Sequence, residues 1–438
     1  MPKITIVGAG SHVFARRLIA DLLTWPALRD STIALMDIDQ ESLDTMAALA
    51  KKMVEQQGVG ARIEATTDLE EALTDADYVS VSIRVGSSYQ HVLIPAKYGI
   101  MHSVGDTMGP GGVFYFLKNA PAMVNIAQTM ERVCPNALML NYTNPMVMLS
   151  WAIKDLTNIR YVGLCHSVQG TAQSMAEYIN VPFEDVSYWA AGINHMAWFL
   201  KYNVNGQDAY PMLFEAMQDP DVYNRDIVKF EVMKHFGAFV SESSIHMSEY
   251  VPYFRRTQEL IEQHTHEAMW GVWNPQMSRE ERMALFAERR AEADREMREL
   301  AFGDAPVPDA WLERSHEFFS RILNASETNV PYTFNGNVPN TGLITNFPDN
   351  VVVEVPIVTD AMGLHPCHVG ALPPALAALN SSNLYVQELA VKGFIEQNRE
   401  YIYQAIQVDP LTASLLSLAE IRQMVDEMFA AEAEYMTF

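Results

Sequence analysis

Cysteine is scarce in this sequence: Cys134, Cys165 and Cys367 are the only three among 438 residues. So few cysteines, in an odd number, argue against a disulfide framework and are typical of a reducing compartment, so we expect a cytoplasmic location. Apolar runs of the ~18 residues needed to cross a bilayer are also lacking. The start Met1-Pro2-Lys3 leads directly into a strand-like segment, from which we expect no signal peptide.

Positive charge is also in short supply. Lys and Arg number 30 against 54 Asp and Glu, which gives a formal net charge of −24. Nucleic acids and anionic membrane surfaces are bound through clusters of Lys and Arg, so neither is an expected partner. Hydrophobic residues make up 49% of the chain, enough for large buried cores. The length is typical of about two to three domains.

The segment 1–165 alternates strand-like and helix-like patterns. We expect strands at Lys3–Val7, Ser31–Met36, Arg62–Thr66, Asp77–Arg84, Ala137–Asn141 and Arg160–Cys165. Helical spacing of apolar residues lies between them, at Val13–Leu23, Glu41–Gln57, Leu69–Leu73, Val113–Val133 and from Pro145 onward. This alternation implies right-handed βαβ units, so we predict an α/β fold with a doubly wound, Rossmann-like parallel sheet.

The pattern changes in the second half of the chain. Asn205-Gly206 after the β-rich run Trp198–Val204 predicts a hairpin. We expect a long, solvent-facing helix at Ser278–Leu300, a strand at Val351–Ile357 and a late helix at Ala413–Met428. Two domains are therefore predicted, a Rossmann-like domain at 1–189 and an α+β domain at 190–438. The sequence lacks an obvious linker between them, so we expect a broad shared interface.

Gly8-Ala9-Gly10 follows the first predicted strand and opens a helix. This arrangement lets a pyrophosphate approach free backbone N–H groups at a helix N-terminus. Asp37 ends the second strand, where a carboxylate accepts hydrogen bonds from ribose hydroxyls and repels a 2′-phosphate, which favours NAD over NADP. The alternative is a tight turn followed by an ordinary helix-capping Asp.

Polar residues gather at the ends of three more predicted strands. They are Arg84, the run Asn141-Tyr142-Thr143-Asn144-Pro145, and Cys165-His166. In open parallel sheets, ligands bind beyond the carboxyl ends of the strands, so these residues are candidates for a site. Helix capping before Pro145 is the alternative role for Asn141 and Asn144.

Two further stretches have the composition of ligand-binding loops. Gly105–Gly112 holds four glycines and a proline, which allow close approach of backbone to a ligand, although a plain surface loop has the same composition. Ser241–Tyr250 mixes possible bases with hydroxyl groups, and the sequence does not rank its members.

Cys165 and His195 are candidate metal ligands. They lie 30 residues apart, a spacing that matches no compact zinc motif, and a buried cysteine or a core histidine is the ordinary alternative. Two protein ligands would leave a divalent ion open to substrate hydroxyls and water, as Lewis-acid chemistry requires.

These segments, in this order, resemble glycoside hydrolase family 4, the NAD- and divalent-metal-dependent glycosidases. The matching segments are Ile6–Ser11, Met36–Asp39, Gly105–Gly112, Asn141–Met146, Cys165–Thr171, Gly192–Met196 and Asn337–Gly342. They span most of the chain. Cys165–Thr171 (CHSVQGT) with Gly192–Met196 (GINHM) is most similar to the α-galactosidase branch.

The resemblance implies roles for individual residues. Cys165 and His195 would bind the metal, usually Mn²⁺ or another divalent ion, and His166 would be the general acid. Asn144 and Asp106 would bind substrate, and the base that removes the sugar C2 proton would be His246 or Tyr250. The implied cofactor-binding residues are Gly8, Gly10, Ser11, Asp37, Arg84 and Asn141.

The mechanism implied by the resemblance is a redox-assisted elimination. NAD⁺ takes a hydride from C3, the resulting ketone acidifies the C2 proton, the C1–O bond breaks, water adds, and the hydride returns. An α-galactoside is the expected substrate, with an α-glucoside, α-galacturonide or α-glucuronide as alternatives and a 6-phosphate not expected. A homodimer or homotetramer is also implied.

Two other classes compete with this interpretation. An NAD-dependent sugar or hydroxy-acid dehydrogenase would release NADH and would not need the Cys165–His195 pair. A nucleotide sensor without catalysis would need Gly8, Gly10 and Asp37 but would have no use for His166.

Overall fold

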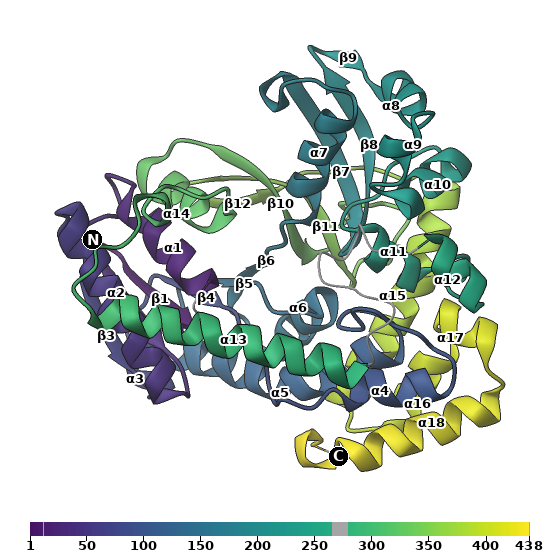
Figure 1. The fold of residues 1–438 in the computed structure, drawn as a ribbon, viewed down its shortest axis with the longest axis horizontal. Helices are drawn as coiled ribbons and strands as arrows, with labels where there is room; N and C mark the ends of the chain where they lie inside the picture. Colours follow the sequence, from purple (N-terminus) through teal and green to yellow (C-terminus); the bar gives the residue numbers. More distant parts are fainter. Residues whose placement is uncertain (12, 265–278, 438) are drawn as a thin grey trace.

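The computed structural model describes residues 1–11, 13–264 and 279–437. A 12-stranded sheet runs through the described residues (Figure 1). Its strands lie in the order β3 (Arg62–Thr66), β2 (Thr32–Met36), β1 (Lys3–Val7), β4 (Tyr78–Val81), β5 (Leu138–Asn141), β6 (Arg160–Gly163), β10 (Tyr332–Pro339), β11 (Val352–Asp360), β7 (Val186–Ile193), β8 (Met196–Val204) and β9 (Gln207–Asp208), with β12 (Gly363–Pro366) beside β11.

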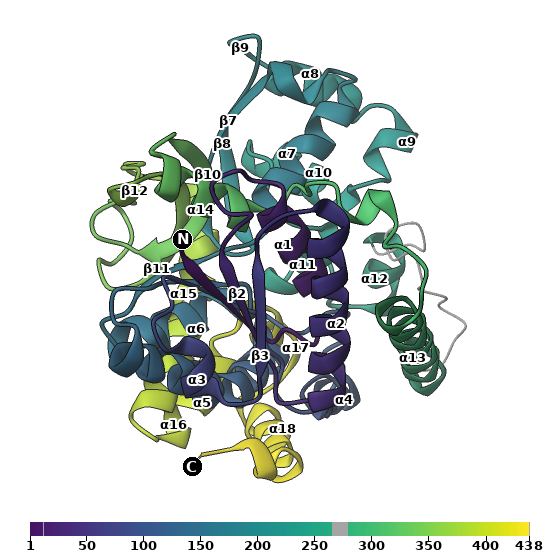
Figure 2. The same ribbon diagram turned by 90° about the vertical axis from the view of Figure 1, so that its left-hand side faces the viewer.

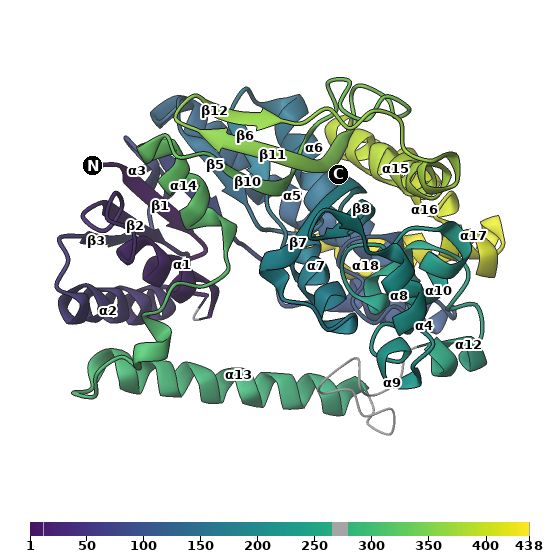
Figure 3. The same ribbon diagram turned by 90° about the horizontal axis from the view of Figure 1, so that it is seen from above.

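The first six strands of that order pair in parallel, and the others pair antiparallel. Helices α1 (Phe14–Leu23) and α2 (Gln40–Gln57) cover one face of β1–β3, while α3 (Leu69–Leu73) lies on the other (Figures 2 and 3). Next to α3, helix α5 (Gly109–Val133) packs against α6 (Met146–Leu156). Coverage of both faces explains the nearly continuous apolar strands, and the predicted doubly wound α/β fold is confirmed.

The remaining α-helices lie between and after these elements along the chain. They are α4 (Gln90–Lys97), α7 (Ser167–Tyr178), α8 (Tyr210–Ala216), α9 (Pro220–Tyr223), α10 (Ile227–Phe236), α11 (Ser244–Tyr250), α12 (Gln258–His264), α13 (Arg279–Phe302), α14 (Phe318–Thr328), α15 (Pro374–Ile395), α16 (Arg399–Gln407), α17 (Pro410–Leu415) and α18 (Leu418–Ala431). The long charged helix is confirmed as α13, which packs against α2 (Figure 3). Its predicted first residue, Ser278, lies outside the described residues.

The predicted hairpin at Asn205-Gly206 is confirmed between β8 and β9. Both residues have positive φ, 51° and 81°, as a two-residue turn matched to the strand twist requires. The predicted domain division at 189/190 falls within β7 and stays a prediction. No helix in the described part of the chain is both long and apolar enough to span a membrane.

Four predicted boundaries are wrong. The strand predicted at Asp77–Arg84 ends at Val81, and the one predicted at Arg160–Cys165 ends at Gly163, so their polar ends lie in loops. The expected loop Gly105–Gly112 is only half a loop, because α5 begins at Gly109 with Pro110, whose fixed φ suits a first helical turn. The predicted helix Ala413–Met428 is two helices, since Ser417 caps α18 in a capping box with Glu420.

Candidate active site

The predicted site residues of the N-terminal half follow the carboxyl ends of neighbouring strands. Gly8 comes after β1, Arg84 after β4, Asn144 after β5 and Cys165 after β6. These four strands are adjacent in the sheet, in the order β1-β4-β5-β6. The topology therefore brings the predicted dinucleotide and metal residues to one edge, where α/β sheets bind ligands.

The turn after β1 has the geometry of a backbone cradle. Gly8 has φ +87°, and a Cβ there would lie 1.9 Å from the carbonyl oxygen of Ser82, so only glycine fits. Asp37 stabilises this turn, since its carboxylate accepts hydrogen bonds from Gly10 N at 2.7 Å and Asp39 N at 3.0 Å. The cradle fits a dinucleotide, and the ribose contact predicted for Asp37 stays a prediction.

The loops after β4 and β5 hold the next predicted residues. The Arg84 side chain is exposed, with its guanidinium 4.6 Å from the centroid of the Tyr89 ring. Asn141 is buried and bonds the backbone of Thr143 through both ends of its amide, at 2.8 and 3.2 Å. Helix α6 has Pro145 at its N-cap with no side-chain hydrogen bond, so helix capping is wrong for Asn141 and Asn144.

A polar cluster forms where three separate segments meet. Asp106 accepts hydrogen bonds from Asn144 Nδ2 at 3.3 Å and from Thr107 Oγ1 at 2.8 Å. His246 Nε2 lies 3.8 Å from Asp106 Oδ1, and its Nδ1 lies 2.8 Å from Ser243 Oγ. The side chains predicted to bind substrate therefore lie beside one of the two predicted bases.

Cys165 and His195 come together with a third residue, Glu242, as a candidate metal centre. Their possible ligand atoms all lie within 4.8 Å of one another. The thiol follows β6, the imidazole stands at the β7–β8 turn, and the carboxylate precedes α11. Glu242 belongs to the stretch Ser241–Tyr250, whose members the sequence does not rank, and it was not predicted as a ligand.

His195 is oriented by hydrogen bonds to one ring nitrogen. Its Nδ1 lies 3.1 Å from Tyr250 Oη and 3.5 Å from Thr107 Oγ1. A hydrogen on Nδ1 would leave Nε2 as the lone pair for a metal, the usual outer arrangement of a ligating histidine. Tyr250 is buried, and burial raises the pKa of its hydroxyl well above the ordinary value. The base role predicted for Tyr250 or His246 stays a prediction.

The electrostatics of this cluster fit a divalent cation. Burial raises the pKa of the Cys165 thiol, and it raises the pKa of the Glu354 carboxyl to about 7. Burial would also raise the pKa of Glu242, but His195, His246 and Lys229 outweigh it and lower that pKa. Within the described residues, Glu354 Oε1 is buried without a hydrogen-bond partner. Thiol, imidazole and carboxylate donors beside an unpaired buried carboxyl oxygen match what a divalent metal requires.

His166, the predicted general acid, stands at the start of α7. Its Nε2 lies 2.5 Å from Glu317 Oε2, and its ring stacks on Tyr142 at 5.8 Å between centroids. The hydrogen bond to Glu317 raises the pKa of His166. The side chain is 57% exposed, so the proton it carries can reach a ligand.

Glu317 and Glu354 were not among the predicted site residues. Glu354 had a usable signal, because it is a single acidic residue within the apolar run Val351–Ile357. Glu317 had none, since nothing in its neighbourhood of the sequence points to His166.

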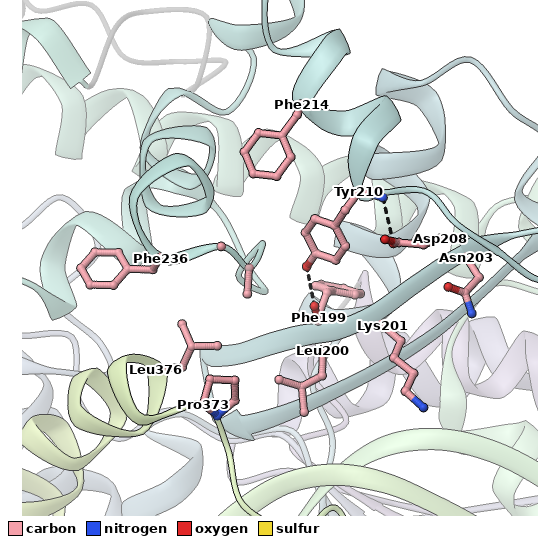
Figure 4. A pocket seen from close by; sticks show the side chains of 12 residues that line it. Phe199, Leu200, Lys201, Asn203, Asp208, Tyr210, Phe214, Phe236, Pro373 and Leu376 are labelled. Atoms are coloured by element: carbon pink, nitrogen blue, oxygen red, sulfur yellow. Dashed lines mark hydrogen bonds between the residues drawn. The ribbon is translucent and has the colours of Figure 1, made fainter.

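A separate cavity of about 500 Å³ lies beside β8, β9 and α8 (Figure 4). The side chains that line it are mainly apolar, and β8 and β9 add polar groups. Figure 4 labels Phe199, Leu200, Lys201, Asn203, Asp208, Tyr210, Phe214, Phe236, Pro373 and Leu376. It contains none of the predicted site residues.

The family descriptions that match this chain agree with the names of similar proteins. The family description "Family 4 glycosyl hydrolase" matches residues 3–181, and that of its C-terminal domain matches residues 190–412. An alpha-galactosidase of Bacillus subtilis (strain 168) is 38% identical over 100% of this chain and 99% of its own. An alpha-galactosidase of Rhizobium meliloti (strain 1021) is 34% identical over 99% of this chain and 89% of its own.

Among solved structures, a 6-phospho-alpha-glucosidase from gut microorganisms, in complex with NAD and Mn²⁺, has a TM-score of 0.82. It is 21% identical to this chain, and the match covers 99% of both chains. At this identity the likeness shows the fold, which the two proteins share along their whole length. With the family descriptions matched along both halves of the sequence, the chain belongs to glycosyl hydrolase family 4 and is a glycoside hydrolase.

Proposed function

We propose that this glycoside hydrolase cleaves α-galactosides and that it needs NAD⁺ and a divalent metal, with Mn²⁺ as the first candidate. The observation that carries the proposal is the shared sheet edge: the dinucleotide turn after β1 and the Cys165–His195 pair open at the same end of the parallel strands. The two relatives at 38% and 34% identity, both named alpha-galactosidase, support the choice of sugar.

The bound groups and the chain have separate tasks. NAD⁺ supplies a reversible hydride acceptor and the metal supplies a Lewis acid for sugar hydroxyls. Cys165 and His195 would hold the metal, and Gly8, Gly10, Ser11, Asp37, Arg84 and Asn141 would line the dinucleotide site. The Gly8 turn offers backbone N–H groups to the pyrophosphate because no Cβ fills it.

Side chains in and around the polar cluster of Asp106, Asn144 and His246 would transfer protons. Glu317 bonds Nε2 of His166, so Nδ1 is the nitrogen that would donate a proton to the departing glycosidic oxygen. His246 is the stronger candidate for the base at sugar C2, because it is half-buried beside Asp106 whereas Tyr250 Oη is engaged by His195. Asp106 and Asn144, hydrogen-bonded to each other, would bind sugar hydroxyls.

A panel of p-nitrophenyl glycosides tests this function. The full chain would be assayed with NAD⁺, Mn²⁺ and a thiol reductant on α- and β-galactosides, glucosides, galacturonides and glucuronides. We expect hydrolysis of the α-galactoside without accumulation of NADH, and deuterium at C2 of galactose released in D₂O. Full activity after both cofactors are stripped would refute the proposal, and sustained NADH release would favour a dehydrogenase.

We also propose that the protein is cytoplasmic and forms a homodimer or homotetramer. The three cysteines, all free, support a reducing location. Light scattering behind size-exclusion chromatography tests the assembly, for which a mass of 49.2 kDa, that of one chain, would be the contrary result.

A further inference from the structure

We propose that Glu242 is a third protein ligand of the divalent metal, beside Cys165 and His195. The inference rests on the metal dependence in the proposed function and adds a residue to it. The family resemblance implies only the cysteine and the histidine as ligands, and no pattern in the sequence assigns a role to Glu242. The structure places a Glu242 carboxylate oxygen, the Cys165 sulfur and a His195 nitrogen within 4.8 Å of one another, close enough to surround one ion.

The backbone holds Glu242 in place on both sides. Ser241 pairs with β8, since its N donates to the Ala197 carbonyl at 2.8 Å and its Oγ accepts from Ala197 N at 3.1 Å. Ser243 is the N-cap of α11, where its side chain accepts from His246 N. Glu242 therefore sits between two anchored neighbours, unlike a glutamate on a freely moving surface loop.

The conformation of Glu242 itself is unusual. Its φ is +68°, in the left-handed region that residues other than glycine, asparagine and aspartate rarely adopt. The Thr171 hydroxyl donates to its carbonyl at 3.4 Å and thereby ties the strained residue to α7. Such strain persists where the surroundings determine the conformation, and it is concentrated at functional sites. Here it directs the carboxylate toward Cys165 and His195.

Charge and ligand preference support the same assignment. A thiolate is soft, whereas Mn²⁺ and similar ions prefer oxygen donors, so a carboxylate makes the set more suitable for such a metal. One thiolate, one carboxylate and a neutral imidazole carry two negative charges, which balance a divalent cation. Glu354 is the other nearby acid, but it contacts Asn194 Nδ2 at 3.4 Å and does not belong to the group of three.

Two other roles for Glu242 make different predictions. Its Oε1 lies 3.5 Å from His246 Nδ1, so one alternative is that Glu242 serves that histidine as an ion-pair partner and does not bind the metal. It could also act as the base at sugar C2. In either case the affinity for the metal would not depend on Glu242.

The test measures metal binding directly. Glu242→Gln keeps the shape of the side chain and removes its charge. The full chain, with NAD⁺ and a thiol reductant present, is titrated with Mn²⁺, and the electron paramagnetic resonance signal measures the free Mn²⁺. We expect the Kd for Mn²⁺ to rise at least about tenfold, as loss of groups around a metal site does. The control, Glu231→Gln on α10, should bind Mn²⁺ as the wild type does.

Cobalt gives a second readout that a folding defect would not imitate. With Co²⁺ in place of Mn²⁺, Glu242→Gln should keep the thiolate-to-cobalt absorption band of Cys165 while its d–d bands change. Wild-type Mn²⁺ affinity in Glu242→Gln would overturn the inference, and loss of C2 deuterium exchange in that variant would then identify Glu242 as a base. A wild-type protein that binds Mn²⁺ but cleaves no glycoside would refute the proposed function alone, and one that binds no divalent metal would refute both.

Discussion

Glu317 determines the state of the proposed acid, His166, from 151 residues away in the sequence. Its carboxylate is 6% exposed and lies 2.5 Å from His166 Nε2, and this contact raises the pKa of the imidazole. A general acid acts only while it carries its proton, so a raised pKa keeps His166 active to higher pH. The backbone N of Glu317 donates to Ser315 Oγ, which in turn donates to Asp21, so the backbone of Glu317 is attached to α1.

Glu317→Gln tests this pairing. The amide retains a hydrogen bond but not the negative charge, so His166 would lose its proton at lower pH. We expect the basic limb of the kcat–pH profile to move to lower pH, while the Kd for NAD⁺ stays the same. Glu327→Gln on α14, the helix that begins directly after Glu317, is the matched control. An unshifted profile in Glu317→Gln would show that His166 is not the acid.

Side chains that follow a strand could be predicted as site residues, because parallel strands deliver their carboxyl ends to one edge. Asn144 and Cys165 were found in this way. Glu317 could not be, since it stands just before α14, whose placement beside His166 depends on contacts across the whole chain. Glu354 stands out as an acidic residue in an apolar strand, but its position beside His195 depends on how β11 pairs. Contacts between segments far apart in the chain cannot be predicted from the residues next to each one.

The periodicity of apolar residues located most helices and strands, and the wrong boundaries have local causes. The glycines of Gly109–Gly112 suggest a loop, yet Gly112 must be glycine because a Cβ there would lie 2.2 Å from the Thr107 carbonyl carbon. The helix start is thus packed against the segment before it. In the late helices, an apolar pattern continues through Leu416, and only the cap at Ser417 separates α17 from α18.

Helix α11 also positions the loop that carries Asp106. Glu249 is buried on this helix and accepts three backbone hydrogen bonds, from Ser103 N at 2.6 Å, Val104 N at 2.9 Å and Gly105 N at 3.0 Å. Burial would raise the pKa of Glu249, but His102 and Arg255 help to lower it, so the carboxylate stays ionised. One side chain therefore determines the conformation of the residues just before Asp106.

Glu249→Gln should loosen that loop. The amide NH₂ would face a backbone N–H, which leaves a buried donor unpaired and costs about 2 kcal/mol of unfolding free energy. Because Asp106 is displaced, we expect the KM for the glycoside to rise while the Kd for NAD⁺ is unchanged. Urea unfolding and steady-state kinetics measure both, with exposed Glu259→Gln as the control. An unchanged KM would mean that Glu249 serves stability alone.

The sheet joins the two halves of the chain. Strands β10 and β11 insert between β6 and β7, through pairs such as Asn337 with Gly163 and Glu354 with Gly192. The sequence predicted a second α+β region but not this insertion, because strand pairing over such separations has no local signature. The insertion is what brings Glu354 beside His195.

The C-terminal end of the chain contacts the loop after β4, at the edge of the sheet where the dinucleotide is proposed to bind. Glu432, just after α18, accepts hydrogen bonds from Lys118 Nζ at 3.2 Å, Ser88 Oγ at 3.1 Å and His91 N at 3.1 Å. The Lys118 and Glu432 side chains are 1% and 0% exposed. Ser88 belongs to the loop after β4 that carries Arg84. The C-terminal segment thus holds a loop whose Arg84 is proposed to bind NAD⁺.

Removing Lys118 alone should lower the free energy of unfolding more than removing Lys118 and Glu432 together. Lys118→Met would leave the Glu432 charge buried and unpaired, which lowers the unfolding free energy by about 3–5 kcal/mol. The double variant Lys118→Met/Glu432→Leu should recover much of that loss in urea unfolding. Both variants should bind NAD⁺ more weakly by calorimetry, because the Ser88 carbonyl loses the hydrogen bond from Lys118 Nζ at 3.1 Å. In the double variant, the Ser88 hydroxyl also loses its acceptor on Glu432. If the double variant regained stability and also wild-type affinity for NAD⁺, the C-terminal segment would have no part in shaping the cofactor site.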